Sequence, residues 1–348
     1  MPIVTSRFRP PLFLCNGHLQ TILPVLLPRN FVVTYERERF ELDDGDFLDL
    51  DWVRSGSDKL AIFLHGLEGS SEDGFARGTA ALLWSAGWDV LAWNFRSCGR
   101  EMNRLVRFYH SGDTGDLDVL TRLVVPTYSR VALVGVSLGG NVTLKYLGER
   151  IPPPSVIAAV AISVPVDLRA SAFALDHRWS NRIYLNRFIK SLVAKVEKKA
   201  ISFPDQFDMR EIRSVRTLRQ FDDRYTAPIH GFRDAADYWR QSSSLQYLRW
   251  ISVPTLLLNA RDDPFLTRES FPYSDAGENA NLFLETPESG GHVGFIDFAN
   301  RFERWCEQRI VEFLSAVAAR KRDDTAQQLS IAGVGPDLRA GRSKEADL

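Results

Sequence analysis

Short, almost entirely apolar runs recur along most of the chain, and amphipathic segments lie between them. The runs are rich in Val, Ile, Leu and aromatic residues and are bounded by turn residues, a pattern typical of buried β-strands. They cover residues 60–66, 89–95, 131–137, 156–165, 254–260 and 281–287. Because buried strands that alternate with helices form parallel sheets, the pattern predicts an α/β fold whose mostly parallel sheet is covered by helices on both faces.

Two further strands are expected before this alternation begins. Residues 31–42 and 47–53 are strand-like and flank the turn signal DDGD, which brings the expected sheet to eight strands. Helical periodicity is found at 74–88, 114–128 and 138–150. The same periodicity predicts a last long helix over about 295–319, with an apolar stripe of Phe302, Trp305, Ile310, Leu314 and Val317.

The alternation of strand and helix stops between residues 166 and 250. This segment is polar, helical in character (YLNRFIKSLVAKVEKKA) and too long for a simple crossover. We expect an inserted helical cap above the carboxyl edge of the sheet, where open α/β sheets bind ligands. The core would then comprise 31–165 and 251–320. Residues 1–30 would pack on this core, and 321–348, with few large apolar residues, would form a disordered tail.

The composition excludes several classes of function. The 348 residues include 43 Lys and Arg against 44 Asp and Glu, so charge gives no reason to expect nucleic acid or an anionic membrane as a partner. The three cysteines are scattered, which predicts neither a disulfide framework nor a zinc site. Prolines and polar residues interrupt the apolar runs near the start, so we expect no signal peptide, no stable membrane anchor and a cytoplasmic location.

The strand at 131–137 ends on Ser137, and a helix follows at once. Gly135 and Gly139 lie two positions before and after this serine. The G-x-S-x-G pattern is weak alone, but between a buried strand and a helix it is typical of a nucleophile elbow, whose tight turn needs small flanking residues. The helix N-terminus also directs its dipole at charge that forms beside the serine oxygen. The alternative is a glycine-rich turn without chemistry.

A serine hydroxyl needs an adjacent base to act as a nucleophile. In an α/β-hydrolase the base is a histidine after the last strand, and of the six histidines only His292 has that position. The acid should follow the strand at 254–260, where Asp262 and Asp263 are adjacent. The usual pattern places the acid three residues after the end of that strand, which favours Asp263 and leaves Asp262 as a surface or cap charge.

Acyl transfer also requires hydrogen-bond donors for the oxyanion. The strand at 60–66 ends in His65 and Gly66, a bend that would direct the Leu67 N–H toward the serine. The Leu138 N–H would supply the second donor. We expect His65 itself to be structural.

Several longer stretches together identify a family. They are GHLQTI, HGLEGSS, NFRSCGREMNR, YHSGDTGDL, GVSLGGN, FDDRYTAPIHGFRDAADYW, ARDDPF and GGHVGF. On the basis of these stretches the chain, apart from its tail, resembles the YheT-like branch of the α/β-hydrolases. This branch is related to the animal α/β-hydrolase-domain proteins of types 1 to 3. The resemblance implies an α/β-hydrolase fold and a serine hydrolase acting on lipid-like or short-chain acyl esters, with the triad on Ser137, Asp263 and His292.

The chain departs from that family in two respects. Ser97 replaces a glycine in NFRSC, where it would narrow the pocket or add a hydrogen bond if this loop lines the site. The animal relatives carry an N-terminal membrane anchor, and this sequence has no matching segment. A membrane location is therefore not part of the expectation.

Other residues in these stretches have no assigned chemistry. His18, His110 and His230 could meet near the active site, but their spacing favours packing and hydrogen bonding over a metal site. Asp222 and Asp223 are expected either to pair with arginines where the cap closes on the core or to form a solvated charge pair.

The combined expectation is a carboxylesterase or lipase-like enzyme for small acyl esters, lipids included, without metal or cofactor. The alternatives are an acyltransferase with the same triad and a non-catalytic binding protein of this fold. The cap segment IYLNRFIKSLVAKVEKKA could also make weak membrane contact, although packing within the cap explains the pattern as well. Acyl-chain length and oligomeric state do not follow from the sequence.

Overall fold

A single twisted sheet organises the protein. The computed structural model describes residues 3–27, 29, 33–297 and 304–319. The nine strands are ordered β1-β9-β8-β7-β6-β4-β5-β3-β2, and every pair is parallel except β2–β3 and β3–β5. The strands are β1 (Ile3–Val4), β2 (Glu36–Glu41), β3 (Phe47–Val53), β4 (Lys59–Leu64), β5 (Asp89–Asn94), β6 (Arg130–Val136), β7 (Val156–Ile162), β8 (Thr255–Leu258) and β9 (Leu282–Glu285).

The mostly parallel α/β fold is confirmed, with one strand more than expected. The additional strand is β1, in which Ile3 pairs with Leu284 of β9. Two residues are too few to produce a recognisable alternation of apolar and polar positions, so this edge strand has no signal in the sequence.

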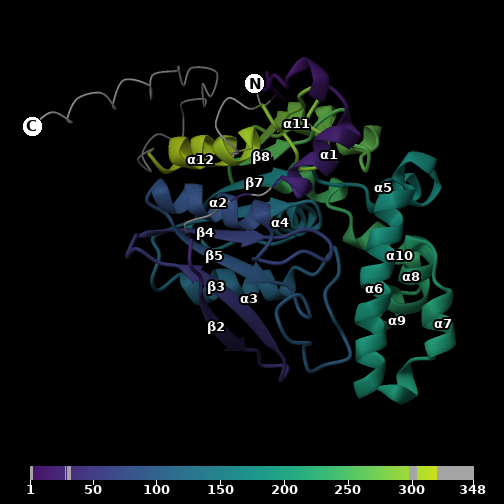
Figure 1. Ribbon diagram of the computed structural model, residues 1–348. Coiled ribbons are helices and arrows are strands. Elements are labelled where there is room, and N and C mark those ends of the chain that lie inside the picture. The colour runs from purple at the N-terminus through teal and green to yellow at the C-terminus, as the bar shows by residue number, and fades with distance from the viewer. Residues whose placement is uncertain (1–2, 28, 30–32, 298–303, 320–348) are drawn as a thin grey trace, which may run out of the picture.

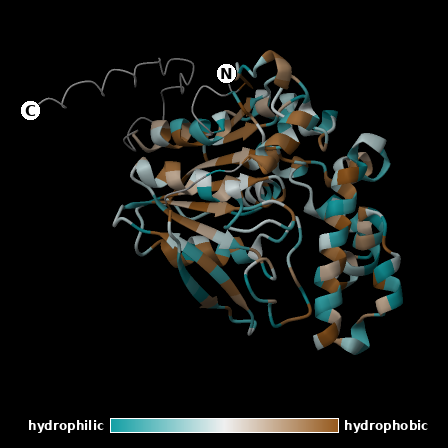
Figure 2. Ribbon diagram, viewed as in Figure 1, coloured by the Kyte–Doolittle hydropathy of each residue, from teal (hydrophilic) through white to brown (hydrophobic). Residues whose placement is uncertain are grey.

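Helices cover both faces because successive side chains of each strand point to opposite sides. Leu60, Ile62 and Leu64 of β4 join one core, and Ala61 and Phe63 join the other. The first core packs on α3 (Gly115–Val124), α4 (Leu138–Glu149) and α11 (Tyr273–Glu278), and the second on α2 (Gly74–Ser85) and α12 (Trp305–Ala318). Figure 2 shows the apolar character of the central strands.

The last helix is shorter than predicted. It begins at Trp305, whereas Phe295 lies in a non-helical segment whose N–H bonds to the Gly290 carbonyl. Phe302, part of the expected apolar stripe, and the expected tail lie outside the described residues. Ile310, Leu314 and Val317 do face the core.

Between β7 and β8 the chain forms a group of helices with a core of its own. They are α5 (Leu168–His177), α6 (Arg182–Ser202), α7 (Met209–Ser214), α8 (Leu218–Phe221), α9 (Ala227–Ile229) and α10 (Ala235–Ser242), with a π-helical turn at Asp222–Thr226. Figure 1 shows them gathered beside the sheet. Their apolar faces form a third buried cluster. We call this helical group the cap; the predicted boundaries 166–250 stay a prediction.

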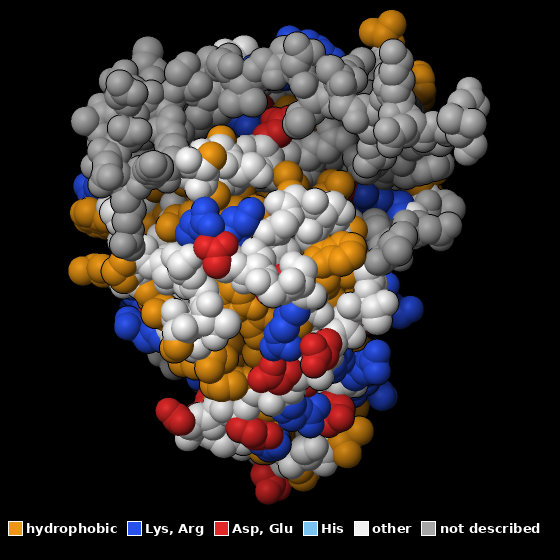
Figure 3. Space-filling model, turned by 90° about the vertical axis from the view of Figure 1, so that its left-hand side faces the viewer, with side chains coloured by type: hydrophobic (Ala, Val, Ile, Leu, Met, Phe, Trp, Pro, Cys, Tyr) orange, Lys and Arg blue, Asp and Glu red, His pale blue; other side chains and the backbone are white. Residues whose placement is uncertain are grey.

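The surface mixes charges of both signs. On the face shown in Figure 3, acidic and basic side chains lie next to one another rather than in separate fields. Arg54 at the edge of the sheet, for example, pairs with both Glu36 and Glu38 of β2. In the ranges that the structure describes, no helix has the length and apolar character needed to cross a bilayer.

Candidate active site

Ser137 lies at a strained turn between β6 and α4. Its φ is 53° and its ψ is −116°, a conformation that residues with a side chain rarely adopt. Gly135 and Gly139 make the turn possible, because a Cβ on Gly139 would collide with the carbonyls of Leu64 and His65, and one on Gly135 with the Gly139 carbonyl. The turn thus places the serine side chain at the carboxyl end of β6.

His292 lies in the loop after β9 and bonds to Asp263, which lies in the loop after β8. His292 Nδ1 is 2.8 Å from Asp263 Oδ2. Asp263 is 4% exposed, and its other oxygen accepts a 2.9 Å bond from the Phe265 N–H. The carboxylate is therefore fixed in direction and holds the imidazole of His292, a residue that lines the cavity, through Nδ1.

Asp262 has a different place from the one expected. It is neither a surface charge nor part of the cap, because its Oδ1 accepts a 2.8 Å hydrogen bond from the N–H of Gly291, next to His292. Gly291 has φ 58°, in the left-handed region where glycine is favoured. The two neighbouring acids thus contact the same loop, one at its backbone and one at its imidazole.

The N-terminal helix α1 (Gly17–Leu26) supports the histidine loop. The His292 N–H donates a 2.8 Å bond to the Thr21 hydroxyl. Gln20 is fully buried, and it accepts from the Ile296 N–H at 2.8 Å and donates to the Ile296 and Leu14 carbonyls. The stretch GHLQTI was recognised in the sequence, but its contact with a loop so distant in the chain could not be seen there.

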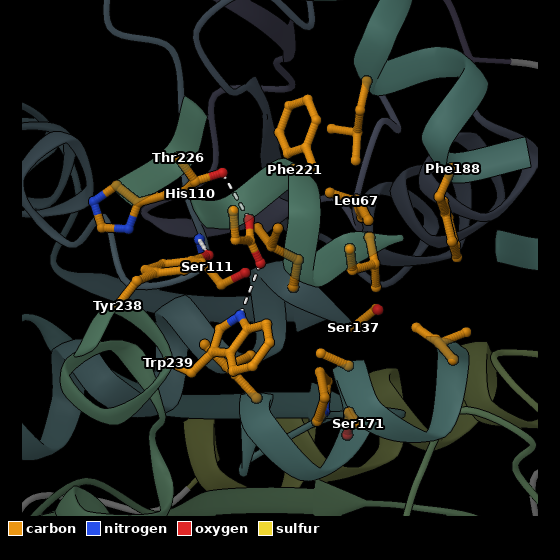
Figure 4. Close-up of a pocket in the computed structure, with 18 of the residues that line it drawn as sticks. Leu67, His110, Ser111, Ser137, Ser171, Phe188, Phe221, Thr226, Tyr238 and Trp239 are labelled. Atoms are coloured by element: carbon orange, nitrogen blue, oxygen red, sulfur yellow. Dashed lines mark hydrogen bonds between the residues drawn. The ribbon is translucent and has the colours of Figure 1, made fainter. Parts of the chain in front are cut away.

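Ser137 and His292 line one cavity together with the two predicted oxyanion residues, Leu67 and Leu138. Among the described residues, no hydrogen bond joins the Ser137 and His292 side chains, and neither leucine N–H has a hydrogen-bond partner. Figure 4 shows Ser137, Leu67 and Phe188 on one side of this space. Most of the side chains that line the cavity are apolar, and the cap helices α5, α6 and α8 contribute several of them.

The loop that carries Leu67 is tied to the cap by a buried ion pair that the sequence did not reveal. Lys195 of α6 donates a 2.6 Å bond to Glu68, and Ser191 donates to the other Glu68 oxygen at 2.6 Å. Glu68 has φ 56°, and its N–H donates to the Tyr109 hydroxyl at 2.8 Å. A charged contact therefore fixes the residue next to the Leu67 N–H.

Asp222 departs from both expectations for the FDDRY stretch. It has no arginine partner among the described residues, and it is not a solvated charge, because it lines the cavity and accepts 2.7 Å bonds from Thr226 Oγ1 and Trp239 Nε1. Burial raises its pKa to about 7 despite these two donors. Asp223 does lie near an arginine, at 3.5 Å from Arg219, and it also accepts from the Ala235 N–H.

Two of the three histidines of unassigned role meet, and the third lies elsewhere. His110 and His230 have ring centroids 4.6 Å apart, whereas His18 bonds to Tyr184 at 3.1 Å. Burial lowers the pKa of His110 to about 3 and that of His230 to about 2, so both are neutral near pH 7. The part of the chain that the structure describes contains no cluster of metal-ligating side chains.

His65 and Ser97 have packing roles. His65 accepts a 3.2 Å bond from the Phe95 N–H through Nε2, and burial lowers its pKa to about 4. Ser97 has φ 65° and bonds to Asn103. It is not one of the described residues that line the cavity, so the departure from the usual glycine has no direct effect on the site.

Comparisons with known proteins identify the family of this chain. The profile of the alpha/beta hydrolase fold family matches residues 60–299. The protein named "Putative esterase YheT" from Escherichia coli (strain K12) is 36% identical over 327 residues, covering 91% of this chain and 95% of its own. "Phospholipase ABHD3" from Mus musculus is 29% identical, covering 85% of this chain and 75% of its own.

A solved structure shares the fold at lower identity. The Pyrococcus furiosus esterase Pf2001 superposes with a TM-score of 0.56 at 20% identity, covering 84% of this chain and 96% of its own. The profile spans more than half of this chain, and the YheT relative covers nearly all of it. This protein belongs to the YheT-like branch of the α/β-hydrolase fold family.

Proposed function

We propose that this protein is a serine hydrolase that cleaves carboxylic acyl esters with Ser137, His292 and Asp263. The observation that carries the proposal is the 2.8 Å contact of His292 Nδ1 with Asp263, beside a cavity that both His292 and Ser137 line. The esterase and phospholipase names of its relatives support ester hydrolysis as the class of reaction.

In this proposal His292 Nε2 accepts the Ser137 proton as Oγ attacks the ester carbonyl. Asp263 keeps the imidazole in the required tautomer and stabilises its protonated form. The Leu67 and Leu138 N–H groups, together with the N-terminus of α4, stabilise the oxyanion. The alcohol leaves with the proton from His292. Water then attacks the acyl-enzyme while His292 accepts its proton, and His292 returns that proton to Ser137 as the acid is released.

The cap defines the substrate side of the proposed site. Its apolar lining favours a hydrocarbon chain, so we propose small acyl esters, lipids included, as substrates. In this proposal residues 166–250 form the cap as one structural unit that contacts the substrate. The proposed reaction requires water and the side chains named above, with no metal or organic cofactor.

The proposal is tested by labelling with a fluorophosphonate probe, together with hydrolysis of p-nitrophenyl esters from acetate to palmitate. We expect the wild-type protein to be labelled and active, and Ser137→Ala to lose both labelling and turnover, because the covalent step requires Oγ. The dependence of kcat/KM on acyl length would then show which chains the cavity accepts.

Ser171→Ala is the matched control, because Ser171 lines the same cavity and its hydroxyl has no hydrogen-bond partner among the described residues. It should keep both labelling and turnover near the wild-type level. A folded wild-type protein that is not labelled, or a Ser137→Ala variant that still turns over, would contradict the proposal.

A further inference from the structure

Polar side chains gather at one end of the cavity, although most of its lining is apolar. Figure 4 shows Thr226, His110, Ser111, Tyr238 and Trp239 on the side away from Ser137, Leu67 and Phe188. Asp222 belongs to this end, and it is the one acidic side chain among the described residues that line the cavity.

The Asp222 carboxyl group has a fixed orientation. Asp222 and Thr226 are the first and last residues of the π-helical turn, and π-helical turns are frequent at functional sites. Thr226 donates to one carboxyl oxygen and Trp239 to the other, both at 2.7 Å. Each oxygen accepts one hydrogen bond in this way and keeps a second lone pair for another donor.

No cation compensates this acid. Asp222 forms no ion pair within the described residues, and the charged side chains that act on it most strongly are two further acids, Asp176 and Asp223. His110 and His230 on the same side are neutral near pH 7. Burying a carboxyl group without a counter-charge reduces stability, so a purely structural link between the π-helical turn and α10 would be better made by apolar residues.

We propose that Asp222 forms a subsite for a hydroxyl group that the substrate carries at a distance from its ester bond. The inference rests on the proposed function and extends it by naming a polar feature of the substrate. A hydroxyl donates one hydrogen bond, which matches the remaining lone pairs of the carboxyl group, and it does so whether the acid is neutral or ionised.

Other substrate groups match this end of the cavity less well. A carboxylate or phosphate would be repelled by the ionised form of Asp222. A primary ammonium group needs three acceptors and loses a strong hydration shell on burial. A methyl terminus would leave the carboxyl group facing hydrocarbon without its water, and sites built to bond a hydroxyl reject such analogues.

The test uses p-nitrophenyl esters whose acyl chains have matched lengths of six to ten carbons and end in methyl, hydroxyl, trimethylammonium or carboxylate. A second set carries the same end groups on the alcohol of butyrate esters, because either part of the substrate could reach the polar end. We expect the wild-type kcat/KM of the best hydroxyl ester to exceed that of its methyl counterpart by about tenfold or more.

The key variant is Asp222→Leu, which has a similar size and makes the cavity apolar. It should reverse the preference, so that the methyl ester becomes the better substrate, whereas the neighbouring Asp223→Asn should keep the wild-type ranking. Fluorophosphonate labelling of Ser137 in each variant shows whether the reacting groups are intact. If Asp222→Leu does not fold, the order of kcat/KM among the esters, measured for the wild type and for Asp222→Asn, still tests the hydroxyl subsite.

A wild-type preference for the methyl or the trimethylammonium ester would overturn the subsite, as would a hydroxyl preference that Asp222→Leu leaves unchanged. These outcomes differ from failure of the proposed function, in which Ser137 is not labelled and none of the esters is hydrolysed.

Discussion

At the scale of single residues, two neighbouring acids show how far position along the chain determines a role. Asp262 and Asp263 are the same residue type at adjacent positions. Only the usual spacing from the preceding strand favours Asp263 as the acid of the triad. In the structure Asp263 contacts the imidazole of His292, while Asp262 binds the backbone of Gly291. The two adjacent side chains therefore reach different parts of the same loop.

Asp263→Asn should lower kcat/KM for p-nitrophenyl esters by about 10⁴-fold, because an amide no longer holds the required imidazole tautomer. Asp262→Asn should lower it by about tenfold or less, since the amide oxygen can still accept from the Gly291 N–H. Steady-state kinetics on both purified variants measure the difference. Losses of equal size would show that the two acids are not separated in function as we propose.

The burial of Asp222 marks the limit of prediction at this scale. In the sequence FDDRY the acid stands among other charged residues, which indicates an exposed face. In the structure Asp222 is the first residue of the π-helical turn and lines the cavity. Its hydrogen-bond partner Trp239 is 17 positions away, a contact that local sequence does not reveal.

At the scale of elements, every strand except β1 was predictable, and the contacts between distant elements were not. Buried strands produce continuous apolar runs whatever their partners, so local sequence suffices. The link between α6 and the Leu67 loop depends instead on Lys195 and Glu68, which are 127 positions apart. Charged residues in a helix usually indicate a solvated face, and Lys195 contradicts that rule because it is 8% exposed.

Lys195→Met should lower kcat by about tenfold or more, with a much smaller change in KM, because it frees Glu68 and with it the Leu67 N–H, the proposed oxyanion donor. Lys198→Met, at an exposed position of the same helix, is the control and should leave both constants near wild type. Kinetics with one p-nitrophenyl ester separate the two constants. A change in KM alone would refute the positioning role.

At the scale of the whole molecule, the family stretches stabilise the fold as well as the site. Arg96, in the NFRSC stretch, is 3% exposed and bonds to three acids from two segments, Asp44 and Asp46 in one and Asp116 in the other. Its position joins the β2–β3 turn to α3. The sequence identified this stretch as characteristic, but which residues a buried arginine joins depends on the tertiary fold.

Arg96→Met should reduce the free energy of unfolding by about 3–5 kcal/mol, because it leaves the acids without their shared cation. Arg54→Met removes an exposed pair of salt bridges and should cost about 1 kcal/mol or less. Urea unfolding followed by tryptophan fluorescence compares the two. Similar midpoints for both variants would mean that the buried cluster contributes no more than the surface pairs.

The contact of α1 with the histidine loop has a consequence for synthesis of the chain. Gln20 and Thr21 leave the ribosome more than 270 residues before their partners, Ile296 and His292. The α1 segment must therefore wait without these partners while the residues between them are translated. A chain that stops before the loop of the proposed base cannot have a working site.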